Sequence, residues 1–150
     1  MDLASLDAEA AHLTLPRFDE GLALQLGHIM VELAQGLPVV INIRNAHRTF
    51  FHAALPGSQA NNDNWARRKS NTALMTGQAS MLVGLKNAAR KRSLADDGLG
   101  AADYADHGGA VPIVVQGVGL VAVATVSGLP QQEDHRLVVR GIEALKTHLT

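Results

Sequence analysis

A run of cations beside the only tryptophan of the chain is the first feature that could do chemistry. Residues 64–69 read Asn-Trp-Ala-Arg-Arg-Lys, and the pattern predicts a helix that begins near Asp63. Cations in the first two turns oppose the positive end of the helix dipole, at a cost of about 0.3–1 kcal/mol each. An anion bound there would reverse that cost, because free N–H groups and cations would converge on it. We therefore expect Trp65, Arg67, Arg68 and Lys69 to line an anionic-ligand site.

The same cations have a second interpretation, in which they pair with acids of this chain or of a neighbouring subunit. Seven cations and no acid lie between Arg67 and Arg92, so the near-neutral total hides a basic segment. Those from Lys86 to Arg92 fall at the expected end of a helix, where the dipole favours cations. We expect that second group to be solvated.

Seven histidines offer candidates for proton transfer or metal binding. His52 falls in a predicted strand. His135 follows Asp134 in the first turn of the last predicted helix and should face inward, so these two residues are weak candidates for a catalytic pair. The run Asp103-x-x-Asp106-His107 could hold a metal, but its glycine-bounded loop favours ordinary turn chemistry, and we expect no metal site. Known nucleophile, phosphate-loop and dinucleotide motifs are absent, so no reaction is predicted.

Composition excludes several classes of function. Thirteen Lys and Arg against fourteen Asp and Glu give a net charge of −1, which is unfavourable for a dedicated nucleic-acid binder. The absence of cysteine excludes disulfides, thiol catalysis and iron–sulfur clusters. The acidic start is unlike a secretory leader, and the uncharged stretch 108–132 contains turn residues that argue against a membrane span. We expect a cytoplasmic protein with no nucleic-acid or membrane partner.

Helices and strands alternate in a pattern that predicts how these residues are positioned. The first 15 residues form a flexible or partly helical lead-in. The following elements are a helix at 18–35, strands at 38–44 and 49–55, a helical stretch at 63–92 that breaks near Gly77, strands at 110–115 and 120–127, and a helix after Pro130. Tight turns make each strand pair antiparallel. Residues 1–150 are therefore predicted to form one α+β (α/β) domain in the order α-β-β-α-α-β-β-α, an antiparallel sheet flanked by helices.

Several motifs together resemble a known family. These are Ala-Leu-Pro-Gly at 54–57, Asn-Trp-x-Arg-Arg-Lys-x-Asn at 64–71, Gly-Gly-x-x-Pro-Ile at 108–113, Ser-Gly-Leu-Pro at 127–130 and Glu-Asp-His at 133–135. From about Phe18 to the C-terminus the chain resembles a bacterial and fungal family related to the GlcG/HbpS-like, haem-degrading-domain proteins. The resemblance implies a profilin-like fold and a homo-oligomer. It adds Asn64 and Asn71 to the ligand site, and makes haem a candidate cofactor, with His52 or His135 as candidate iron ligands.

Three hypotheses stay open at this point. The first is a domain that binds a small anionic ligand or haem through the 64–71 segment. The second is a non-catalytic, homo-oligomeric assembly or chaperone-linked protein, in which the cations meet acids of a neighbouring subunit. The third is an enzyme for a small carboxylated metabolite, with His135 and Asp134 handling protons. The family's tryptophan–arginine motif contains no histidine, which favours an anionic ligand over haem.

Overall fold

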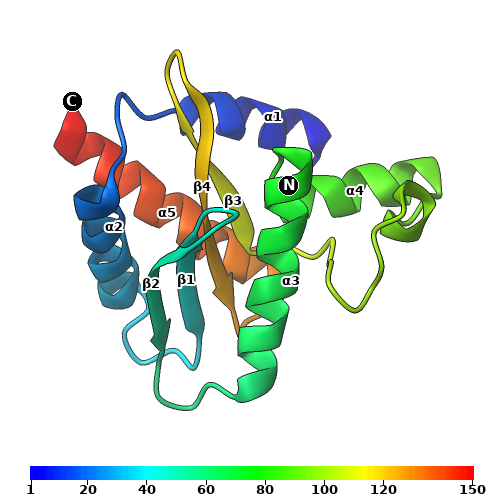
Figure 1. The fold of residues 1–150 in the computed structure, drawn as a ribbon, viewed down its shortest axis with the longest axis horizontal. Helices are drawn as coiled ribbons and strands as arrows, with labels where there is room; N and C mark the ends of the chain where they lie inside the picture. The colour runs from blue at the N-terminus through cyan, green and yellow to red at the C-terminus, as the bar shows by residue number, and fades with distance from the viewer.

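A computed structural model describes residues 1–150, and its elements follow the predicted order (Figure 1). The bounds are α1 Leu3–His12, α2 Glu20–Leu33, β1 Val40–Arg44, β2 Thr49–Ala54, α3 Ala60–Thr76, α4 Ser80–Arg90, a 3-10 turn at Leu94–Asp97, β3 Ala110–Val115, β4 Gly119–Ser127 and α5 Gln131–Leu149. The lead-in is partly helical as predicted, because the Asp2 carboxylate caps α1 by accepting the Ser5 N–H.

The four strands form one antiparallel sheet in the order β2-β1-β4-β3. The two predicted hairpins therefore lie side by side, with β1 paired to β4 at the centre. This pairing joins residues that are 79 to 87 positions apart in the sequence, from Arg44 with Val123 to Val40 with Ser127. The mixed α+β class with an antiparallel sheet flanked by helices is confirmed.

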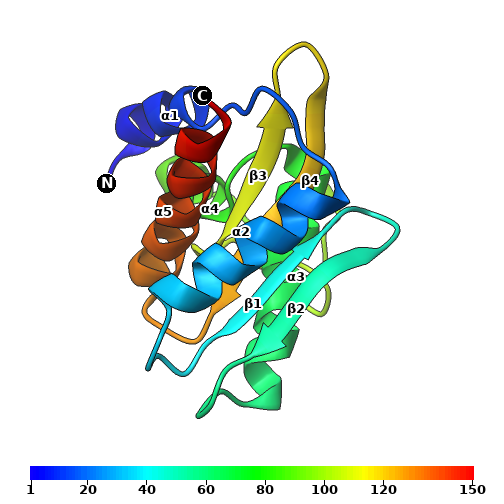
Figure 2. The same ribbon diagram turned by 90° about the vertical axis from the view of Figure 1, so that its left-hand side faces the viewer.

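One face of the sheet is covered by α2 and α5 and holds the main apolar core (Figure 2). Fully buried side chains from both layers meet there, including Leu26, Met30, Ile41, Ile113 and Ile142. Apolar burial at about 25 cal/mol per Å² makes this face the main source of stability. Its packing leaves the other face free to carry polar groups.

The opposite face packs on α3 and is unusually polar. Ser70 and Thr125 share a buried hydrogen bond of 2.8 Å between helix and sheet, and Lys69 and Thr72 are also buried. Buried polar groups persist only when they are hydrogen-bonded, so these contacts fix where α3 sits. The predicted break after α3 is confirmed, because Gly77 ends the helix with a left-handed φ of 70°.

The start of α3 differs from the prediction. The helix begins at Ala60, three residues before Asp63, because Asn62 Oδ1 accepts the Gln59 N–H at 2.8 Å and stabilises an earlier first turn. The helix that was expected at 18–35 is shorter, Glu20–Leu33, and begins where the Asp19 carboxylate caps the Leu22 N–H. None of the helices combines the length and apolar character that crossing a bilayer requires.

Candidate functional site

The earlier start of α3 corrects the reasoning from the helix dipole. Arg67 is the eighth residue of the helix, so it and the next two cations lie about two turns or more beyond the N-terminus. The dipole effect fades within the first turn. The free N–H groups of the helix start therefore do not converge with Arg67, Arg68 and Lys69, and the unfavourable placement that we inferred from the sequence is wrong.

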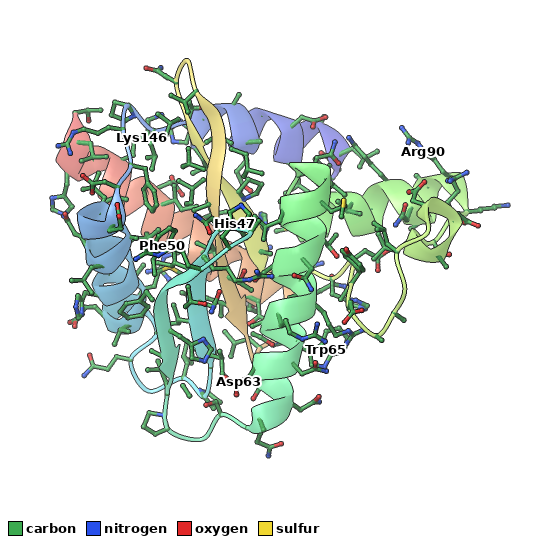
Figure 3. All side chains as sticks on the ribbon, in the orientation of Figure 1. His47, Phe50, Asp63, Trp65, Arg90 and Lys146 are labelled. Carbon is green, nitrogen blue, oxygen red and sulfur yellow. The ribbon has the colours of Figure 1, made fainter.

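Side chains of the 64–71 segment leave α3 in different directions. Figure 3 shows Trp65 on one side of the helix and Asp63 on the side of β2. Lys69 shares the side of Trp65, whereas Arg67 points to the loop that carries Asp103. The segment thus contributes to three separate clefts instead of one: Trp65 and Lys69 border the first, Arg67 the second and Arg68 the third.

The first cleft lies where α3, the loop before β3 and the start of α5 meet, and we call it the Trp65 cleft. Its volume is about 310 Å³. It is bordered by the predicted Trp65, Lys69 and Asp134 and by six residues that were not predicted, Asn62, His107, Ser127, Gly128, Leu129 and Gln131. The end of β4 forms one wall, because Ser127 and Gly128 are its last strand residue and the first residue beyond it.

A buried ion pair forms the floor of the Trp65 cleft. Lys69 Nζ lies 2.9 Å from Asp134 Oδ2, and both side chains are at most 5% exposed. Burial lowers the pKa of the Lys69 ammonium and raises the pKa of the Asp134 carboxyl, while the attraction between them acts against both shifts. Lys69 also donates to the Val126 carbonyl at 3.4 Å. One of its three N–H donors has no acceptor in the chain.

The double glycine before β3 lets the backbone pass directly over Lys69. Gly109 has a φ of 142°, and a Cβ there would lie 2.4 Å from the Val126 carbonyl oxygen and 2.9 Å from Lys69 Nζ. The Gly108 N–H is held by Gln131 Oε1 at 2.8 Å. These contacts give a physical reason for the glycine pair in the 108–113 motif.

Aromatic and cationic groups surround the indole of Trp65. The Arg68 guanidinium lies over its ring at 4.4 Å from the centroid, and the His107 ring meets it edge-on at 5.2 Å. Arg68 donates from Nε to the Ala101 carbonyl and has no carboxylate partner. Among the three cations of the segment, Arg68 is therefore the one whose charge is not paired within the chain.

The remaining predicted residues of the segment lie outside the Trp65 cleft. Arg67 pairs with Asp103 at 3.0 Å and also donates to Asn64 Oδ1. Asn71 bridges Arg44 and the Asp103 carbonyl. These bonds fasten the loop after the 3-10 turn to α3. Asp103 is thereby committed to Arg67, and Asp106 accepts from Asn87, so the two acids do not converge.

The two histidines that were proposed as iron ligands lie in different surroundings and have different hydrogen-bond partners. His52 bonds through Nε2 to Asp63 at 2.8 Å and through Nδ1 to the Asn42 amide at 3.0 Å. His135 faces inward as expected and is fully buried, with Nε2 2.6 Å from the Glu9 carboxylate of α1. Asp134 and His135 thus bind different partners, Lys69 and Glu9, and no hydrogen bond joins the two.

Sequence reasoning missed the partners that come from distant segments. His107 was noticed only as part of a metal motif, and Gln131 and Asn62 carried no recognisable signal. Glu9 lies 126 positions from the histidine that it contacts. Only the fold brings such residues together, because no local spacing relates them.

Comparison with known proteins agrees with the resemblance. Residues 18–143 match the family described as haem degrading protein HbpS-like. A UPF0303 protein of Paraburkholderia phymatum is 44% identical over 151 residues, which cover 99% of this chain and 90% of that protein.

Solved structures show the same fold. The crystal structure of the Ybr137w protein has a TM-score of 0.87 and 29% identity, with 99% of this chain and 89% of that chain covered. A complex of PduOC with haem has a TM-score of 0.72 and 23% identity, covering 85% of this chain and 94% of that chain. By the match over residues 18–143, the chain belongs to the family described as haem degrading protein HbpS-like.

Proposed function

We propose that the Trp65 cleft binds a small organic acid. The observation that carries this proposal is the floor of the cleft, where buried Lys69 keeps one N–H donor without an acceptor. A ligand carboxylate is the complementary acceptor, since hydrogen bonds between charged partners are the stronger ones. The indole of Trp65 supplies a flat apolar wall for the body of the ligand.

Charge around the cleft supports an anionic ligand in a different way from the helix dipole. Asp134 already neutralises Lys69 at the floor. Arg68 has no carboxylate partner, and its guanidinium lies against the indole that borders the cleft. Arg68 itself lines the neighbouring pocket, so its unpaired charge acts on a ligand of the Trp65 cleft only across the indole. The proposal assigns binding and assigns no reaction.

Titration of the single tryptophan tests the proposal. Trp65 emission should change saturably with small mono- and dicarboxylates. His107→Ala and Gln131→Ala should weaken that response, because both side chains line the cleft. Arg140→Gln, an exposed change on α5, is the matched control. If no acid of the series changes the emission, or if all variants respond alike, the proposal fails.

Haem is the second candidate, because the family is described as haem-degrading and PduOC has been crystallised with haem. The residues of one chain fit it poorly. Haem pockets are largely apolar and provide an axial side chain. Only two of the nine residues that line the Trp65 cleft are hydrophobic. His52 uses both ring nitrogens, and His135 is enclosed beside Glu9.

Haemin titration separates the two candidates. His107 is the histidine that borders the cleft, and its Nε2 has no partner within the chain. A red-shifted Soret band that is lost in His107→Ala would place haem in the cleft instead of a small acid. An unshifted band, together with a saturable response to carboxylates, supports the organic acid.

Self-association is a separate proposal that follows from the family resemblance. Arg67 and Lys69 already pair within the chain, so of the three cations only Arg68 could meet an acid of a second subunit. Mass measurement of the wild type and of Arg68→Glu tests this. Dissociation on charge reversal favours an assembly role for Arg68, and an unchanged mass favours its role beside the ligand.

A further inference from the structure

A second polar cleft lies between α3 and the first hairpin, and we call it the Arg44 cleft. Its volume is about 280 Å³. The strands β1 and β2 contribute two residues each and α3 contributes three, namely Asn42, Arg44, Thr49, His52, Asp63, Ala66 and Arg67. Six of these seven side chains are polar or charged, so the cleft is suited to a hydrophilic ligand.

Arg44 carries a positive charge that nothing in the chain neutralises. Its guanidinium is half-buried and donates to the Asn71 side chain and weakly, at 3.4 Å, to the Asn45 carbonyl. It has no carboxylate partner, and at least half of its five N–H groups are unused. Burial, and then repulsion from Arg67, lower the pKa of Arg44. Charges that leave water are ordinarily paired, so this arginine is an exception that calls for a partner.

The acid inside the cleft is not that partner. Asp63 is held by His52 Nε2 at 2.8 Å. His52 Nδ1 is in turn occupied by the Asn42 amide at 3.0 Å. The carboxylate that serves Arg67 belongs to Asp103, which does not line the cleft. Asp103 thus balances Arg67 from outside the cleft and Asp63 is held by His52, so Arg44 is the charge in the cleft that no acid balances.

The same bonds argue for binding over catalysis. A general base needs a ring nitrogen that is free to take a proton from the ligand. Both nitrogens of His52 are engaged, so it orients Asp63 and does not face a ligand as a base. Thr49 has a hydroxyl that makes no bond within the chain and could donate to an entering oxygen.

We propose that the Arg44 cleft binds a phosphate group, as free phosphate or as a small phosphate monoester. Two guanidinium groups converge on the cleft, and their planar donor forks match the oxygens of phosphate. Arg44 brings the uncompensated charge and three unused N–H groups, which several oxygens of one phosphate can accept together. The site lies on the other side of α3 from the Trp65 cleft, and the two share no lining residue.

Amide-resolved NMR of the full chain tests the proposal, with inorganic phosphate as the probe and constant ionic strength. Saturable shifts should be confined to amides of the Arg44 cleft, and Trp65 emission should not change. Arg44→Gln should weaken binding by about tenfold or more, the effect of one lost charge-assisted hydrogen bond. Arg140→Gln, the same change at an exposed arginine without a carboxylate partner, should bind as the wild type does.

Further arms of the titration define the ligand and guard against misfolding. Arg67→Gln is the second variant if Arg44→Gln does not fold, because Arg67 is exposed. Glycerol 3-phosphate that binds more tightly than phosphate identifies a monoester as the natural source, and the reverse order identifies free phosphate. The proposal is overturned if millimolar phosphate produces no saturable shift, or if Arg44→Gln and Arg140→Gln bind phosphate equally well. It is also overturned if malonate binds more tightly than both inorganic phosphate and glycerol 3-phosphate.

Discussion

Removing Lys69 should destabilise the fold strongly, because Asp134 would keep a buried charge without a counter-ion. The two groups are 2.9 Å apart and almost fully buried. Breaking a buried pair by removing one partner typically costs about 3–5 kcal/mol. With a urea slope near ~2 kcal/mol per M, Lys69→Met should lower the unfolding midpoint by about 2 M. Lys86→Met, at a lysine that has no carboxylate partner, is the control.

A double variant measures the interaction between Lys69 and Asp134 separately from the cost of losing each charge. Asp134→Asn removes the charge but keeps an oxygen that can accept the Leu129 N–H, which Asp134 Oδ1 accepts at 2.9 Å. Replacing both charges can be close to neutral, since neither ion then needs to be desolvated. Lys69→Met with Asp134→Asn should therefore cost less than the sum of the single changes.

The pH dependence gives a sharper check because the two single variants should slope in opposite directions. Burial already raises the pKa of Asp134 above 3.8, and Lys69 opposes that rise. In Lys69→Met the folded pKa of Asp134 rises further, so stability should fall as pH increases from about 4 towards that value. In Asp134→Asn the folded pKa of Lys69 drops further below 10.5, so stability should rise as pH increases towards 10.5.

Urea unfolding followed by far-UV circular dichroism, at several pH values, measures these effects. Circular dichroism is preferable to fluorescence because Trp65 borders the same cleft. The reasoning is refuted if Lys69→Met costs no more than the Lys86→Met control, or if both single variants slope in the same direction with pH.

Three more predictions concern the surroundings of the site. Gly109→Ala should destabilise by about 2 kcal/mol or more, because φ is 142° and the new Cβ would meet backbone oxygen; thermal unfolding beside Gly100→Ala, where the space is open, checks this. Glu9→Ala should loosen the packing of α1, so that the amides of residues 3–12 exchange faster while the protected amides of the sheet do not change. If residues 3–12 exchange as slowly as in the wild type, the bond from Glu9 to the buried histidine does not hold α1 in place. Arg68→Met should shift Trp65 emission and cost about 0.5–1 kcal/mol, the usual worth of an exposed cation–π contact; an unchanged spectrum would contradict that stacking.

Local patterns were sufficient for most elements of the fold. The apolar spacing of residues 18–35, the two hairpins and the glycine at 77 each act through nearby residues, so they could be read without the fold. Bounds shifted by a few residues where caps decided them, as at Asp19 and Gln59. The early start of α3 mattered most, since it removed the dipole argument for the cations.

The sequence predicted some residues of the candidate site but not how they pair. Trp65, Lys69 and Asp134 were all candidates and do meet in one cleft. Their pairing was not predicted, because Lys69 and Asp134 are 65 positions apart and come together only when α3 and α5 pack around the end of β4. The same packing places Arg67 of α3 and His52 of β2 together at the Arg44 cleft.

The order of residues along the chain was enough to establish the periodicities, the turns, the concentration of cations and the family to which the chain belongs, because these depend on neighbouring residues. Which cations are neutralised could be seen only in the folded arrangement. Pairing depends on distance in space, and the order of the strands brings Asp134 to Lys69 and Asp103 to Arg67, while Arg44 and Arg68 are left without an acid.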